Sequence, residues 1–100
     1  MNYIVIVRGT LKSANEKQSR KTHDATVDMI EPKGRSMGNI GHKACLDSKN
    51  RRQFLAIDTW NNLEGPQKLL QDPALAAEFG KLFEGMPEVT ILEEAGWKGW

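Results

Sequence analysis

The stretch FLAIDTWNNLEG, residues 54–65, alternates like a β-strand and then stops at two asparagines. Successive side chains of a strand point to opposite faces of the sheet, so one face of this strand carries a large, a small, an acidic and an aromatic residue. That face is made of Phe54, Ala56, Asp58 and Trp60. Such a mixture is more typical of a pocket wall than of a filled core.

A second alternating segment, SMGNIGHKACLD at residues 36–47, precedes this strand and is joined to it by the charged, turn-rich stretch DSKNRRQ. Two alternating strands separated by a short polar loop predict a β-hairpin. Gly38 and Gly41 weaken the first strand of the hairpin and predict a bend or a bulge in it.

The register of the hairpin decides which side chains meet. If the numbers of paired residues sum to 100, His42 lies opposite Asp58 and Ile40 lies opposite Trp60, on the face that also carries Phe54. Directly opposite Cβ atoms are roughly 4.5–5.5 Å apart, so His42 and Asp58 could then share a hydrogen bond. A slip of the register by two residues would leave them as diagonal neighbours instead.

The segment before the hairpin predicts one strand and one helix. Residues 3–9, YIVIVRG, are apolar on both faces at the start, which predicts a central strand. Ser13 can cap a helix that ends at Pro32 and Gly34. Two stripes of this helix compete for the buried face, and one of them carries His23.

The segment after the hairpin predicts a short helix capped by Asn62, a second helix and a last strand. Asp72 followed by Pro73 is a helix start signal, and residues 88–94 read as a strand. The helix between them has the clearest apolar stripe of the chain, formed by Leu75, Phe79, Leu82 and Phe83.

The predicted order is strand, helix, strand, strand, helix, strand. This is the ferredoxin-like βαββαβ arrangement of the α+β class, a four-stranded antiparallel sheet with two helices on one face. The other face would leave a large apolar patch in water, and a second copy of the same sheet is its simplest cover. We therefore expect one domain over residues 1–100 and a homodimer joined through its sheet faces.

Composition excludes several classes of function. A net charge of +1 leaves no basic footprint for nucleic acid. Cys45 is the one cysteine, so no internal disulfide forms and a reducing, cytoplasmic compartment is expected. The apolar run YIVIV at residues 3–7 is too short for a signal segment or a membrane span. No spacing of histidine, cysteine and carboxylate residues predicts a metal site.

The run GHKACLDSKNRRQFLAIDTWNNLEGPQKLLQDPALAAEFGKLFEG, residues 41–85, resembles the antibiotic-biosynthesis-monooxygenase group of dimeric α/β-barrel proteins. In that group a hairpin leads to a strand that ends in a tryptophan, and a helix with a short DP break follows. The resemblance implies a ferredoxin-like protomer with a pocket between the sheet and its helices. It also implies an activity that ranges from oxygenation of aromatic polyketides or quinols without metal or flavin to haem degradation, and many members have no assigned reaction.

Two positions argue against the haem-degrading branch of this group. Those members carry a histidine nine or ten residues past the tryptophan and an asparagine on the first strand. Here the helix positions hold Leu69 and Leu70, and Val7 and Arg8 stand on the first strand. No cofactor is therefore expected.

His42 and Asp58 are the candidate catalytic residues. A carboxylate beside an imidazole fixes the tautomer and raises the pKa of the histidine, which suits a general base near neutral pH. Such a base could take a proton from a phenol or an activated C–H bond and leave an anion that reacts directly with oxygen. The alternative is a buried polar pair that only satisfies itself and specifies the register.

Candidate substrate-binding residues surround this pair, namely Trp60, Phe54, Ile40 and His23. The sequence thus predicts a small monooxygenase-like enzyme for an aromatic or quinone-like molecule. Its alternatives are a non-catalytic ligand-binding or stress-associated protein and a purely structural dimer. Trp97 and Trp100 of the tail GWKGW are expected to dock, across the dimer, against the sheet rim or over the mouth of the pocket.

Overall fold

The computed structural model describes residues 1–100 and contains one four-stranded sheet in the order β2-β3-β1-β4. The strands are β1 (Tyr3–Thr10), β2 (Asn39–Leu46), β3 (Gln53–Trp60) and β4 (Glu88–Glu93). Every neighbouring pair is antiparallel, and β1 is a central strand as its apolar sequence predicts. The ferredoxin-like α+β fold is therefore confirmed.

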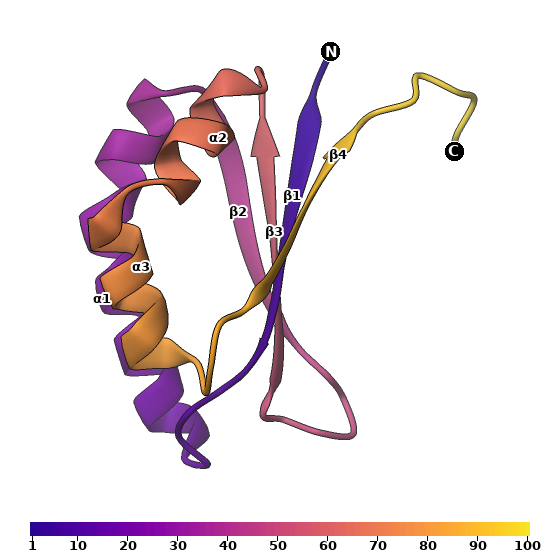
Figure 1. Ribbon diagram of the computed structural model, residues 1–100. Coiled ribbons are helices and arrows are strands. Elements are labelled where there is room, and N and C mark those ends of the chain that lie inside the picture. Colours follow the sequence, from indigo (N-terminus) through magenta and orange to yellow (C-terminus); the bar gives the residue numbers. More distant parts are fainter.

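Three helices cover one face of the sheet and leave the other face open (Figure 1). They are α1 (Glu16–Ser36), α2 (Glu64–Leu70) and α3 (Pro73–Leu82). The last two replace the second helix of the simplest βαββαβ order. They meet at Asp72, whose side chain accepts a hydrogen bond from the Ala74 backbone N–H at 2.9 Å and caps α3.

Helix α1 differs from its predicted bounds at both ends. Its N-cap is Asn15, whose side chain accepts a hydrogen bond from the Gln18 N–H at 3.0 Å, while Ser13 hydroxyl accepts one from the Asn15 N–H. The helix also continues through Pro32 to Ser36. A proline removes one backbone donor, but Pro32 lies on the exposed side of α1, where the carbonyl left without that partner can be solvated.

The hydrophobic core lies between the helices and the covered face of the sheet. Phe83, only 2% exposed, is at its centre, and the rings of Phe54 and Phe79 meet it edge-on. The predicted stripe of α3 faces this core. Ten buried residues form the cluster: Val5, Val7, Leu11, Phe54, Ala56, Trp60, Leu69, Leu75, Leu82 and Phe83.

The open face of the sheet is also rich in apolar side chains. Register places Ile4 beside Leu92 and Thr59, and Ile6 beside Ile57. Ile4, Ile6 and Ile57 are half-buried within the single chain. The face carries, by the same register, Ile4, Ile6, Cys45, Leu55, Ile57 and Leu92.

The C-terminal tail does not dock on its own chain. Trp97 is 88% exposed and Trp100 is fully exposed. Figure 1 shows the tail leaving β4 on the side away from the helices. The expectations that it packs on the sheet rim or closes the pocket are therefore wrong within one protomer, because the chain turns away from both after Glu93.

Gly65 fixes how α2 leaves the sheet. A Cβ atom at this position would lie 2.3 Å from the Met37 carbonyl oxygen and 3.0 Å from two ring carbons of Trp60. The Gly65 N–H also donates to the Asn62 side chain at 2.6 Å, and the Asn62 amide donates to the Met37 carbonyl at 3.0 Å. Glycine at residue 65 is thus what allows α2 to begin directly above the Trp60 ring.

Gly65→Ala should therefore lower the free energy of unfolding by about 1–3 kcal/mol or more, because the added methyl group meets backbone on one side and a buried ring on the other. Gly80→Ala is the matched control, since a Cβ atom there has no neighbour within 4 Å. It should instead raise stability by about 0.5–1 kcal/mol as a helix-interior glycine is removed. Urea denaturation of both variants measures the difference; equal effects would contradict this packing.

Candidate functional site

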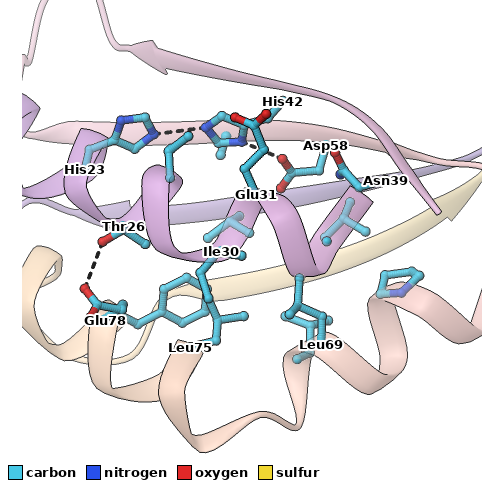
Figure 2. Close-up of a pocket in the computed structure, with 18 of the residues that line it drawn as sticks. His23, Thr26, Ile30, Glu31, Asn39, His42, Asp58, Leu69, Leu75 and Glu78 are labelled. Carbon is cyan, nitrogen blue, oxygen red and sulfur yellow. Dashed lines mark hydrogen bonds and ion pairs between the residues drawn. The ribbon is translucent and has the colours of Figure 1, made fainter. Parts of the chain in front are cut away.

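A pocket of about 270 Å³ lies between the sheet and the helices (Figure 2). Of its 23 lining residues, 13 are hydrophobic, so a bound molecule would contact mainly apolar surface. The polar lining residues come from α1, β2, β3 and α3 and are His23, Thr26, Glu31, Arg35, Asn39, His42, Asp58 and Glu78.

His42 and Asp58 meet as the predicted register requires. They are paired across β2 and β3, and their atoms His42 Nδ1 and Asp58 Oδ1 lie 2.5 Å apart. The Asp58 carboxylate accepts this hydrogen bond and raises the pKa of the His42 imidazole above its ordinary value, while partial burial opposes the rise. Both side chains line the pocket and are only 32% and 20% exposed.

His23 faces His42 from helix α1. The Nε2 atoms of the two rings are 2.9 Å apart, and His23 Nδ1 lies 2.9 Å from Asp24 Oδ1. This hydrogen bond from His23 lowers the pKa of the Asp24 carboxyl. The stripe of α1 that carries His23, Val27 and Ile30 is therefore the face turned to the pocket, and Met29 of the competing stripe is 48% exposed.

Ile40 does not line the pocket, so its predicted binding role is wrong. The pairing runs in step from Leu46 to Gly41 and then shifts, so that Asn39 and not Ile40 is the partner of Trp60. Gly38, with a φ of +109°, and Gly41 flank this β-bulge. The extra residue turns the Ile40 side chain outward, where it is 49% exposed, and brings the Asn39 side chain to the pocket.

Trp60 and Phe54 lie in the pocket wall as predicted, although both are almost fully buried by the core behind them. The Phe54 ring is 5.7 Å from the His23 ring, centroid to centroid. Leu69 and Leu70, the positions where haem-degrading relatives would need a histidine, are part of the same apolar lining.

Besides Asn39, four polar side chains of the pocket were not predicted from the sequence: Thr26, Glu31, Arg35 and Glu78. Glu78, 9% exposed, accepts hydrogen bonds from Lys81 and Thr26, and these hold the pKa of its carboxyl below the ordinary value. Glu31 and Arg35 form an ion pair at 2.9 Å. Thr26 lies one helical turn after His23, so helical spacing from His23 was the available signal.

No group of three or more histidine, cysteine, aspartate or glutamate side chains is arranged to hold a metal ion. Cys45 lies on the opposite face of the sheet from His42, as strand parity predicts. None of the three helices combines the length and hydrophobicity needed to cross a bilayer.

Comparison with known proteins identifies the fold. No protein-family model and no curated protein matches the sequence. Among solved structures, SnoaB, a cofactor-independent oxygenase from Streptomyces nogalater, is similar with a TM-score of 0.75 and 13% identity, over 96% of this chain and 95% of that chain. The chain has the fold of this oxygenase.

Other solved structures agree with this result. A proposed antibiotic biosynthesis monooxygenase from Bordetella bronchiseptica is similar with a TM-score of 0.75 and 11% identity, over 94% of this chain and 97% of that one. Rv0793 from Mycobacterium tuberculosis has a TM-score of 0.68 and 16% identity, over 99% and 100% of the two chains. The predicted resemblance to the monooxygenase-like group is thus confirmed at the level of the fold.

Proposed function

We propose that the protein is a small oxygenase that acts without a cofactor on an aromatic or quinone-like molecule bound in the pocket. The observation that carries this proposal is the His42–Asp58 pair, an imidazole held by a carboxylate at 2.5 Å in the wall of a mostly apolar cavity. The fold shared with a cofactor-independent oxygenase supports it.

The reaction needs a base and no electron carrier other than the substrate. His42 takes a proton from the C–H or O–H group of a quinol or an anthrone, and the resulting anion is electron-rich enough to reduce dioxygen. Recombination forms a carbon–oxygen bond and a peroxide anion, which regains the proton. Loss of water from the hydroperoxide, with the second C–H hydrogen, leaves a ketone. One anthrone CH₂ group and one O₂ thus give one C=O group and one water; a quinol gives the same balance by losing one O–H hydrogen and the C–H hydrogen of the ring carbon that is oxygenated.

Asp58 orients the base. An ionised carboxylate can only accept, so it fixes the proton of His42 on Nδ1 and leaves the Nε2 lone pair as the basic site. The same contact stabilises the imidazolium that forms when the substrate proton is transferred. In this role Asp58 resembles the orienting carboxylate of other histidine bases without itself touching the substrate.

The pocket favours a flat, uncharged substrate. Phe54 and Trp60 supply aromatic surface and the leucines of α2 and α3 an apolar roof. Glu31 is already paired with Arg35, and Glu78 with Lys81 and Thr26, so an anionic substrate finds no free cation among these groups. Asn39, which the β-bulge brings into the pocket, can hydrogen-bond a carbonyl or hydroxyl group at the rim beside Trp60.

A ligand-binding protein without turnover is the second candidate. The observation that favours it is that both ring nitrogens of His42 already have partners, Asp58 at 2.5 Å and His23 at 2.9 Å. The pair would then fix the shape of the pocket and recognise a ligand by hydrogen bonding alone.

Replacing His42 by Phe should lower the rate of oxygen uptake with a quinol or an anthrone by at least about 100-fold, because a positioned base contributes this much or more. Tyr3→Phe is the matched control, since it removes a polar group from an aromatic ring whose hydroxyl contacts only the exposed Glu93. Circular dichroism establishes that both variants are folded.

Unchanged turnover in folded His42→Phe would remove His42 as the base. Binding of the same compounds by the wild-type protein without any oxygen uptake would instead favour the ligand-binding candidate.

We further propose that the protein is a homodimer joined through the open faces of two sheets. Ile4, Ile6 and Ile57 lie on that face beside further apolar residues, which together form a patch of the kind that marks an interaction site. Cys45 lies on the same face and would be covered in this dimer. The exposed tryptophans of the tail would also gain a surface on which to pack.

Ile6→Lys should convert the dimer to a monomer, because it places a charge in the middle of the apolar face. Ala77→Lys adds the same charge on the exposed surface of α3 and should leave the dimer intact. Sedimentation velocity at micromolar concentration measures the state of each. A wild-type monomer, or an Ile6→Lys variant that sediments like the wild type, would contradict the proposed interface.

A further inference from the structure

Four side chains form a continuous line of hydrogen-bond contacts from the surface into the pocket. The line runs from Asp24 to His23, His42 and Asp58, with contact distances of 2.9, 2.9 and 2.5 Å (Figure 2 shows the last three residues). It joins α1 to β2 and β3, and the Asp24 side chain at its outer end is 58% exposed.

The two imidazole rings meet end to end. Their planes differ by only 20°, and their centroids are 5.2 Å apart while the Nε2 atoms are 2.9 Å apart. The distance between the centroids exceeds the distance between the Nε2 atoms by about two ring radii. Both Nε2 atoms therefore lie close to the line that joins the centroids. The lone pairs of Nε2 lie in the ring planes, so this arrangement is that of an in-line N–H···N hydrogen bond.

Ionised carboxylates at both ends of the line set the tautomers of the two rings. Both carboxylates are acceptors, so His42 carries a proton on Nδ1 toward Asp58, and His23 carries one on Nδ1 toward Asp24. The contact between the Nε2 atoms then needs one more proton, because two bare lone pairs at 2.9 Å repel each other. The two rings together therefore hold three protons on four nitrogens and a single positive charge.

We propose that His23 and His42 act as one proton acceptor, sharing a proton between their Nε2 atoms, and that this pair stores the substrate proton during oxygenation. The second half of this statement rests on the function proposed above. His23 thereby becomes a second catalytic residue, since it touches the transferred proton. Asp24 is a positioning residue that keeps the Nε2 lone pair of His23 aimed at His42.

The proposed reaction needs a group that takes one proton from the substrate and later returns it, and a histidine pair that shares a proton can do both. Once the pair has lost its shared proton, the proton that leaves the substrate C–H or O–H bond enters the gap between the rings, where both Nε2 lone pairs face it. The same proton returns to the peroxide anion before water is lost. Both rings line the pocket, so a bound substrate can exchange a proton with the gap without help from solvent.

Apart from Asp58 and Asp24, the charged groups around the pair are paired with one another or with Asp24. Arg20 contacts Asp24 at 3.6 Å, Glu31 is paired with Arg35, and Glu78 is paired with Lys81. The hydrogen bond to Asp58 raises the pKa of His42, so its protonated form persists to a higher pH than that of an unpaired imidazole and is lost as the pH rises further. The pair can accept a substrate proton only after it has lost its shared proton, and this form becomes more abundant as the pH rises.

Nitrogen-15 NMR of the histidine rings tests the shared proton directly, because the chain contains only two histidines. Both rings should carry a proton on Nδ1, and they should titrate together. His23→Phe should lower the proton affinity of His42 by about tenfold, the loss expected when a charge-assisted hydrogen bond is removed.

Two carboxylate variants on α1 provide a matched comparison. Asp24→Asn should release the Nδ1 proton of His23 and change its tautomer signal, whereas Asp28→Asn, an exposed position four residues further on, should leave both rings unchanged. A His42 titration that is the same in wild type and in folded His23→Phe would overturn the shared proton.

Steady-state kinetics tests the storage role separately. His23→Phe should lower kcat for oxygen uptake with little change in KM. The pH at which kcat rises should also move to lower values, because His42 without His23 is a weaker base and loses its proton at a lower pH. A wild-type kcat and pH profile in this variant would overturn storage. Absence of oxygen uptake in the wild type would overturn the proposed function, while coupled titration of the rings would still support the shared proton.

Discussion

The pairing register between β2 and β3 is the constraint on which the rest of the site depends. It places His42 directly opposite Asp58 in the covered face of the sheet. A slip of β2 by one residue would turn His42 to the open face and leave Asp58, held by the pairing of β3 with β1, without its partner. The bulge at Asn39 to Gly41 then ends the regular ladder, so that the strand leads into Gly38 and the Asn62 contacts beneath α2.

The bulge places the polar side chain of Asn39 at the rim of the pocket, while most of the lining stays apolar. Without it Ile40 would lie beside Trp60 and fill the space that Asn39 now borders. Gly65 acts on the other side of Trp60, where only a glycine lets α2 approach the ring. Two local features around Trp60 therefore shape the pocket: the bulge, which turns Ile40 away, and Gly65, which leaves room for the Trp60 ring beneath α2.

Much of this could be predicted from the sequence, and for physical reasons. Alternation in residues 53–60 and the start signal at Asp72 depend on local chemistry, so β3 and α3 were predicted to within one or two residues of their bounds. The hairpin allowed two registers, one of which places His42 opposite Asp58, and this is the register that the structure has. The solved structures bear out the fold that these elements imply.

What could not be predicted depends on contacts between distant segments. The bulge moved the register by one residue at Ile40, and glycines indicated that a bulge was present but not which side chain it would displace. The end-to-end meeting of His23 and His42 requires the rotation of α1 over the sheet, which two competing apolar stripes left open. Glu78 reaches the pocket only because Thr26 and Lys81 satisfy its carboxylate.

Proton removal by an imidazole in an apolar pocket is the central step of the proposed reaction, and it can be observed without oxygen. An anthrone or quinol added anaerobically to the wild-type protein should show the red-shifted absorption of its anion at a pH where the free compound stays neutral. His42→Phe should bind the compound without that shift. A bound substrate that remains neutral in the wild-type protein at alkaline pH would contradict the account.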